Sequence, residues 1–133
     1  MLYVAFGIFT NGDIIHSLTD GKKENLGRVV ISDWKFRWRG CADVEPSEGD
    51  SFEGLLWRID QDTLDSLDTV EGYPNFYNRV IVQTSHGPAL MYTMVNKGPL
   101  EIPSDHMFAE ICVGYNRNGL DTDQLFEALE EVE

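Results

Sequence analysis

The sequence predicts an α+β domain built around a strongly curved sheet. Short strand-like segments recur along most of the chain, whereas apolar residues at helical spacing occur in only a few short segments. With 133 residues, 42% of them hydrophobic, the chain is long enough to close one hydrophobic core. It contains no internal repeat, and we therefore expect residues 1–133 to form a single domain.

The strand prediction rests on short apolar or alternating runs that turn residues separate. The clearest alternation places aromatic side chains at Trp34, Phe36 and Trp38, with cations between them. Such a stripe could bind anions, but a half-buried strand with a solvated outer face fits the acidic composition better. A Ser-His-Gly sequence at 85–87 indicates a hairpin turn. The predicted strands are 2–6, 28–31, 34–38, 52–59, 77–84 and 88–95, with loops at 20–27, 46–50 and 96–104.

Helices are predicted where apolar residues recur three or four positions apart. The first of them follows Asp60, a good N-cap, and ends before Gly72, which suits the position just after a helix. The predicted helices are 61–71, then 105–114 closed by Gly114, and 121–132 capped by Asp121 or Thr122. Asn11-Gly12-Asp13 is expected to be a turn.

The acidic composition narrows the classes of partner. The formal net charge is −13, from 23 acidic and 10 basic side chains, and it disfavours nonspecific binding to nucleic acid or to anionic membranes. An acidic protein that mimics nucleic acid is an alternative that rests on the net charge alone. The apolar N-terminus lacks the basic region of a signal peptide, and no stretch approaches the length of a membrane-spanning helix. We therefore expect a cytoplasmic protein with no nucleic-acid or membrane partner.

Cysteine and histidine spacing predicts neither a disulfide framework nor a metal site. Cys41 and Cys112 are isolated and are flanked by small or apolar residues, so we expect buried free thiols. His16, His86 and His106 lack the spacing of zinc ligands and are expected to be surface or loop histidines. Glycine-rich phosphate loops are absent from the sequence.

Glu71 is the candidate functional residue that spacing singles out. It lies seven positions after Leu64 and four after Leu67, which puts the three side chains on one face of a helix. Burial and the negative end of the helix dipole would both raise the pKa of its carboxyl group toward neutrality, where proton exchange is efficient. A frayed helix end with Glu71 in solvent fits the spacing equally well. Aromatic residues that could wall such a site follow at once: Tyr73, Phe76 and Tyr77.

The segment FEGLLWRIDQDTLDSLDTVEGYPNFYNR (52–79) combines three short motifs. They are a strand of the form G-x-[VL]-[WY]-x-[IL], a helix bearing L-x-x-L-D-x-x-E-G, and Y-x-R. In this the chain resembles the gamma-glutamylcyclotransferase-like family. The segments LYVAFG (2–7), MVNKGPLEIPS (94–104) and the chain from Gly114 onward also fit, so the resemblance covers nearly the whole sequence.

This resemblance implies a small mixed β-barrel with a few short flanking helices. It implies an acyltransferase activity, the cyclisation of a γ-glutamyl amine or peptide to 5-oxoproline with release of the amine, without metal or cofactor. Glu71 falls on the family's catalytic glutamate. As general acid and base it would take a proton from the substrate α-ammonium and later return it to the departing amine. Backbone N–H groups of the loop after the first strand would hold the substrate carboxylate or the oxyanion.

The loop after the first strand departs from the family pattern, which usually reads Y-G-S-x-[LM]. Here the side-chain hydroxyls and amide of that pattern are missing, although the backbone donors remain. The apolar pair Ile8-Phe9 would suit a less polar ligand. Lys97 could pair with a ligand carboxylate or with Glu71, or be an exposed loop lysine. The expected substrate-binding residues are Phe6, Gly7, Ile8, Phe9, Thr10, Tyr77 and Lys97.

These observations leave two main hypotheses. The first is a cyclotransferase with an altered substrate range, which takes a small γ-glutamyl compound and could form a homodimer. The alternative is a catalytically reduced protein that binds a small molecule on the same fold, with a pocket remodelled by the 6–10 loop. The glutamate at position 71 favours the enzyme, and the substituted loop favours the binder.

Overall fold

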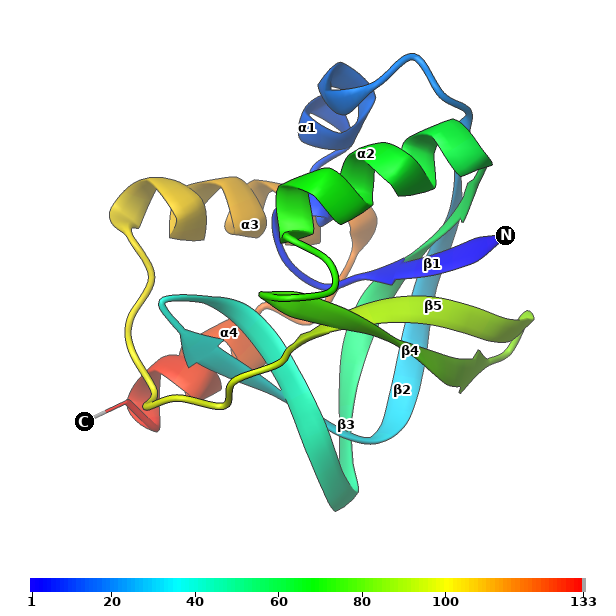
Figure 1. The fold of residues 1–133 in the computed structure, drawn as a ribbon. Helices are drawn as coiled ribbons and strands as arrows, with labels where there is room; N and C mark the ends of the chain where they lie inside the picture. The colour runs from blue at the N-terminus through cyan, green and yellow to red at the C-terminus, as the bar shows by residue number, and fades with distance from the viewer. Residues whose placement is uncertain (133) are drawn as a thin grey trace.

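Residues 1–132 are described by a computed structural model, which confirms the α+β class (Figure 1). Five strands form one sheet in the order β2-β3-β1-β5-β4, in which only the β1–β5 pair is parallel. The sheet is open, because β2 and β4 stand at its two ends, so the closed barrel that the resemblance implied is replaced by an open mixed sheet. The elements are β1 (Leu2–Ala5), η1 (Ile8–Thr10), α1 (Gly12–Leu18), β2 (Lys23–Arg39), β3 (Cys41–Ile59), α2 (Gln61–Glu71), β4 (Tyr77–Thr84), β5 (Gly87–Met94), α3 (Asp105–Asn118) and α4 (Asp123–Glu130).

A long curved hairpin, β2 and β3, joins several segments that the sequence separated. The predicted strands 28–31 and 34–38 are one strand with an irregularity between Ser32 and Trp34, where Asp33 takes a positive φ of 64°. The predicted loop 46–50 lies inside β3, where the N–H of Gly49 donates to the Asp33 carboxylate at 3.0 Å. The turn-forming residues therefore mark a bulge in a continuous ladder, which bends the hairpin, rather than a break between strands.

Helix α2 forms as predicted. The carboxylate of Asp60 caps it by accepting a hydrogen bond from the Thr63 N–H at 2.9 Å, and Gly72 ends it with a φ of 66°. Leu64 and Leu67 are buried against the core. The last residue of this helix is Glu71, whose side chain therefore projects from the same face of α2 as the two leucines.

Two helical predictions need correction. Gly114 does not close the helix that begins at Asp105, because α3 continues to Asn118 and ends at Gly119, where φ is 67°. Instead Gly114 packs against the chain near Thr10, since a Cβ atom at this position would lie 2.2 Å from the Thr10 hydroxyl oxygen. The expected turn at Asn11 is the N-cap of α1, whose first turn its side chain stabilises.

The predicted hairpin forms, and the aromatic stripe faces the core as expected. Strands β4 and β5 pair in register around the turn at 85–86. On β2, Phe36 and Trp38 are buried and Trp34 is partly buried, while the intervening cations on the other face form ion pairs with acidic side chains. Figure 1 shows α1, α2 and α3 gathered on one side of the sheet, whereas α4 packs against β2. No helix within residues 1–132 has the length and apolar character needed to cross a membrane.

Candidate active site

A cavity of about 250 Å³ opens where the end of α2, the segment after β1 and α3 meet over the sheet. Most of its wall is apolar or aromatic, and within it only Glu71 carries a formal charge. The residues that line it are Tyr3, Phe6, Gly7, Ile8, Phe9, Cys41, Ala42, Val70, Glu71, Phe76, Tyr77, Tyr92, Met107 and Ile111. The structure therefore brings together Glu71, Tyr77 and the first four residues of the 6–10 loop, as the sequence analysis expected.

Glu71 is partly buried in the wall of this cavity. Its carboxylate forms no hydrogen bond or ion pair with any other residue in the described range 1–132, and burial raises its pKa to about 7. Loss of hydration is the physical cause of this shift, because a carboxylate without compensating donors is more stable in its neutral form when water is removed. A carboxyl group with this pKa can both accept and donate a proton near neutral pH.

The loop formed by residues 6–10 is fixed by hydrogen bonds from three side chains, two on α3 and one on β3. The hydroxyl of Tyr115 donates to the Phe6 carbonyl at 2.6 Å, the indole N–H of Trp57 to the Phe9 carbonyl at 3.1 Å, and the Asn118 amide to the Thr10 carbonyl at 2.9 Å. In all three bonds the loop contributes a carbonyl acceptor. The first N–H groups of the η1 turn are not used in these bonds, and a turn of this kind supplies no partner for its first N–H groups. The loop is therefore a rigid wall with backbone donors.

Thr10 belongs to this loop but does not line the cavity. Its hydroxyl is buried and donates to the carbonyl of Gly7 at 2.7 Å. The side chains that the loop does present, from Phe6, Ile8 and Phe9, contain no hydrogen-bonding group. The missing hydroxyls and amide noted in the sequence are thus not supplied by Thr10.

Three tyrosines contribute rings to the cavity wall, and two of them use their hydroxyl groups internally. Tyr77 donates to the carbonyl of Ala42 at 2.7 Å, and Tyr92 donates to the carboxylate of Asp68. The third, Tyr3 on the central strand β1, packs edge to face on Tyr92 with ring centroids 5.9 Å apart. Of the aromatic residues expected to wall the site, Phe76 and Tyr77 do so, whereas Tyr73 lies under the Arg79 guanidinium instead.

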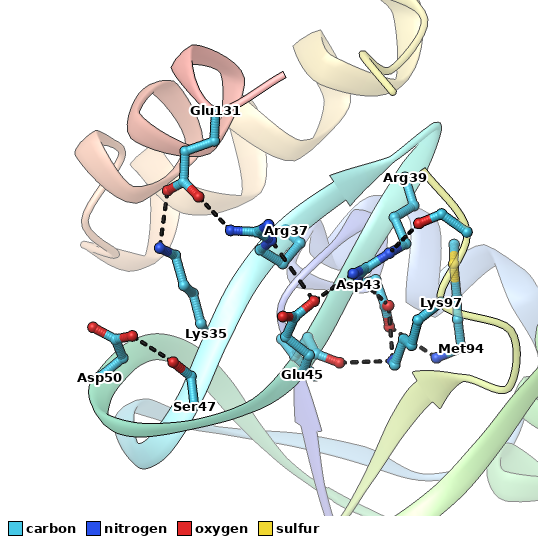
Figure 2. A network of polar contacts seen from close by, with 12 residues as sticks. Lys35, Arg37, Arg39, Asp43, Glu45, Ser47, Asp50, Met94, Lys97 and Glu131 are labelled. Atoms are coloured by element: carbon cyan, nitrogen blue, oxygen red, sulfur yellow. Dashed lines mark hydrogen bonds and ion pairs between the residues drawn. The ribbon is translucent and has the colours of Figure 1, made fainter. Parts of the chain in front are cut away.

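Lys97, like Thr10, is a predicted site residue that the structure places outside the cavity. Its ammonium group donates to the carboxylate of Asp43 at 2.8 Å and to the Val44 carbonyl at 3.0 Å, and also to the hydroxyl of Thr93. Figure 2 shows Lys97 and Arg39 converging on Asp43. Lys97 does not line the cavity, and its ion pair is with Asp43 rather than with Glu71.

Sequence reasoning missed seven wall residues, most of which come from separate strands and helices that meet only in the folded chain. Cys41 is one of them, and its thiol is partly exposed to the cavity rather than fully buried as expected; burial raises its pKa. For Tyr3 the sequence did contain a signal, since the hydroxyl of a tyrosine in a central apolar strand needs a hydrogen-bond partner. The missed residues are Tyr3, Cys41, Ala42, Val70, Tyr92, Met107 and Ile111. In the described part of the chain, no group of three or more His, Cys, Asp or Glu side chains could hold a metal ion.

Comparison with known proteins places this geometry in a family. Residues 3–108 match the model of the family described as gamma-glutamyl cyclotransferase, AIG2-like. No curated protein sequence matches the chain significantly. Among solved structures, one named gamma-glutamyl cyclotransferase superposes with a TM-score of 0.78 at 25% identity, covering 100% of this chain and 88% of that one.

Two further structures show the same fold. An uncharacterised Homo sapiens protein, loc79017, gives a TM-score of 0.75 at 27% identity over 99% of this chain and 87% of that one. YkqA from Bacillus subtilis gives 0.79 at 22% identity, with 99% of this chain matching 55% of that chain. The match to residues 3–108 covers most of the sequence and includes Glu71 and the loop after β1. The chain therefore belongs to the gamma-glutamyl cyclotransferase, AIG2-like family, which supports a cyclotransferase-type function.

Proposed function

We propose that this protein cyclises the γ-glutamyl group of a small amine or peptide to 5-oxoproline and releases the amine, with Glu71 as general acid and base. One observation carries the proposal: a carboxyl group with a pKa of about 7 and no partner among residues 1–132 faces an apolar cavity. In such a setting the carboxyl group is available to a ligand and can exchange a proton with it near neutral pH.

The reaction needs one group that moves a proton twice. Glu71 takes a proton from the substrate α-ammonium, and the freed amine attacks the γ-carbonyl carbon to form a tetrahedral oxyanion. The carbonyl then re-forms while the bond to the leaving nitrogen breaks, and Glu71 gives its proton to that nitrogen. Glu71 next takes the second proton from the new ring nitrogen and passes it to the released amine. The products are 5-oxoproline and the amine as its ammonium ion, with Glu71 again a carboxylate, so atoms and charges balance. Because Glu71 must begin as the carboxylate, we expect kcat/KM to rise with pH through about 7.

The loop after β1 is the proposed anion site. Ile8 and Phe9 of the η1 turn line the cavity, and the loop is held in place by the bonds to the Phe6, Phe9 and Thr10 carbonyls. Backbone donors of such a turn can bind the α-carboxylate of the glutamyl group without any side chain. Lys97 is engaged by Asp43 and is not needed for this role.

The cavity wall also bears on the substrate class. Within the described lining, Glu71 is the single charged residue and no cation is present. A leaving group with its own carboxylate, such as the second half of an acidic dipeptide, would be placed against apolar side chains and would lose hydration without compensation. We therefore expect γ-glutamyl derivatives of uncharged, apolar amines to react faster than γ-glutamyl peptides with extra carboxylates.

The test is a panel of γ-glutamyl amines and peptides assayed for 5-oxoproline. With Glu71→Gln we expect kcat to fall by about 10²–10⁴-fold, because the amide keeps the shape of the side chain but cannot accept the proton. Glu127→Gln, which alters an exposed glutamate on α4, is the matched control and should retain wild-type rates. If wild-type protein makes no 5-oxoproline from any member of the panel, the enzymatic proposal is wrong.

A second function is favoured by one observation. The loop side chains at the cavity are all apolar, and the cavity is therefore also suited to hold a small ligand without turnover. Tight binding of a panel member that yields no product, measured by calorimetry, would support this binding protein over the enzyme. Homodimer formation stays a prediction in either case.

A further inference from the structure

The hydroxyl group of Tyr3 is a buried polar group whose role the fold does not explain. Tyr3 is 4% exposed and lies on β1, the middle strand of the sheet, where it pairs with Trp57 on β3 and Leu90 on β5. Its side chain is thus held from both sides and lines the cavity that contains Glu71. A tyrosine hydroxyl in such a place normally donates to a nearby carbonyl or carboxylate.

In the described chain this hydroxyl has no hydrogen-bond partner, unlike those of the two other wall tyrosines, which donate to Ala42 and Asp68. Within residues 1–132, Arg37 Nε is the one fully covered side-chain polar atom that lacks a hydrogen-bond partner. The Tyr3 hydroxyl must therefore reach open space, and the space that Tyr3 borders is the cavity. An unpaired buried donor costs free energy. A ligand that accepts a hydrogen bond from it therefore binds with a more favourable free energy than a ligand that does not.

The loop after β1 makes this donor more important. Phe6, Ile8 and Phe9 offer no polar side-chain group, and the Thr10 hydroxyl is occupied by the Gly7 carbonyl. Tyr3 is thus the side chain in the lining that can donate a strong hydrogen bond while Glu71 is ionised. Burial and the negative charge of Glu71 both raise the pKa of the Tyr3 hydroxyl, which keeps its proton in place for donation.

We propose that Tyr3 is a catalytic residue that donates a hydrogen bond from its hydroxyl to the γ-carbonyl oxygen of the substrate, beside Glu71 in the same cavity. This inference rests on the proposed cyclotransferase function. Attack requires the α-nitrogen, which Glu71 deprotonates, to come within about 3–3.5 Å of the γ-carbonyl carbon. The carbonyl oxygen is therefore confined to the cavity that Glu71 and Tyr3 share. The bond strengthens as that oxygen becomes negative, and the phenol keeps its own proton throughout.

The experiment compares Tyr3→Phe with wild type on the best substrate of the panel. We expect kcat to fall about ten- to a hundredfold with little change in KM, because a donor to a developing oxyanion acts mainly in the transition state. The thermal midpoint should stay close to that of wild type, because no internal hydrogen bond is lost. Tyr73→Phe is the matched control: this tyrosine lies outside the cavity, under Arg79, and its variant should keep wild-type kcat.

A second measurement covers the case in which Tyr3→Phe does not fold. Wild-type protein labelled with ¹³C at tyrosine Cζ is titrated with 5-oxoproline, whose ring carbonyl is the former γ-carbonyl. We expect the Tyr3 resonance to shift on binding while that of Tyr115, which donates to the Phe6 carbonyl, stays in place.

Two outcomes would overturn the inference but not the proposed function. The first is a Tyr3→Phe variant whose kcat equals that of wild type, and the second is a Tyr3 resonance that does not shift when active wild-type enzyme is saturated with 5-oxoproline. Failure of the wild type to produce 5-oxoproline from the whole panel instead overturns the proposed function, and the inference with it.

Discussion

Two carboxylates that lie away from bulk water are treated in opposite ways by this fold. Asp43 on β3 is completely buried and accepts hydrogen bonds from the Met94 N–H at 2.8 Å, from Arg39 at 2.9 Å and from Lys97 at 2.8 Å (Figure 2). Glu71 is less deeply placed, yet within the described residues it has no partner. Depth of burial therefore does not separate a structural acid from a candidate catalytic one; the supply of partners does.

The difference has a physical meaning. A carboxylate with several donors is fixed in its charged form and joins distant strands, here the start of β3 and the end of β5. A carboxylate without donors keeps its lone pairs free and is easily protonated, which suits proton transfer to a ligand. The surroundings of Glu71 thus reduce stability at neutral pH in exchange for an available proton acceptor, whereas those of Asp43 stabilise the fold.

The largest effect is expected from breaking the Asp43 cluster. Asp43→Asn would leave Arg39, whose side chain is 9% exposed, with Glu45 as its remaining carboxylate, and would leave Lys97 beside a neutral amide. Removing one partner of a buried ion pair usually costs about 3–5 kcal/mol, because the remaining charge stays desolvated. We expect a loss of this size in the free energy of unfolding, measured by urea denaturation.

Asp20→Asn, at an exposed position in the segment between α1 and β2, is the control for this substitution and should change the stability little. A loss below about 1 kcal/mol in Asp43→Asn would contradict the comparison, since it would mean that Glu45 and the Gly98 carbonyl are sufficient partners for Arg39 and that Asp43 is not what stabilises this part of the fold.

The same contrast explains what could be predicted from the sequence. The placement of Glu71 on α2 depends on residues within one helix, and the capping of that helix depends on Asp60 and Gly72 at its ends, so local spacing was sufficient. Arg39 is four positions from Asp43, but two other donors lie about fifty positions away, at separations of 51 residues for Met94 and 54 for Lys97, and no local sequence pattern predicts them.

Lys97 and Tyr3 illustrate the two kinds of error that follow. The sequence offered a ligand carboxylate, Glu71 or solvent as the surroundings of Lys97, but the fold pairs it with Asp43. Sequence reasoning passed over Tyr3 because an apolar strand accommodates an aromatic ring without further explanation. Gly114 shows a related limit: a glycine that permits close packing on Thr10 has the same local signature as one that ends a helix.

The second prediction concerns the pH dependence of stability that an unpartnered glutamate produces. Burial raises the pKa of Glu71 from an ordinary 4.5 to about 7, so between these values the folded state holds a proton that the unfolded state releases. The stabilising contribution of this proton is complete below about pH 4.5 and is lost as the pH rises through 7. Glu71→Gln lacks this dependence and should become more stable relative to wild type by up to about 3 kcal/mol between pH 4.5 and pH 8.

Urea denaturation of both proteins at several pH values measures this difference. Glu127→Gln serves as the control, because its exposed carboxylate should give a curve parallel to that of wild type. Parallel curves for Glu71→Gln and wild type would instead show that the Glu71 carboxylate is solvated or partnered, and the contrast with Asp43 would disappear.

The smallest effect is expected for Lys97, which the sequence assigned to substrate and the structure assigns to Asp43. Lys97→Met removes one of two cations near Asp43, and the side chain that it replaces is one-third exposed. Because Arg39 and the Met94 N–H remain on the carboxylate, we expect a loss of about 1 kcal/mol in the free energy of unfolding. The kinetic constants for 5-oxoproline formation should stay at wild-type values, since Lys97 does not line the cavity.

Lys22→Met, at an exposed lysine before β2, is the matched control and should leave both stability and kinetics unchanged. The result that would contradict this prediction is a KM that rises about tenfold in Lys97→Met without any loss of stability. That result would mean that the 96–104 segment moves when substrate binds and brings the ammonium group from Asp43 to the substrate carboxylate. Asp43 and Glu71 would then belong to one site, in which Asp43 binds Lys97 until the substrate arrives and so provides the cation that the apolar cavity lacks.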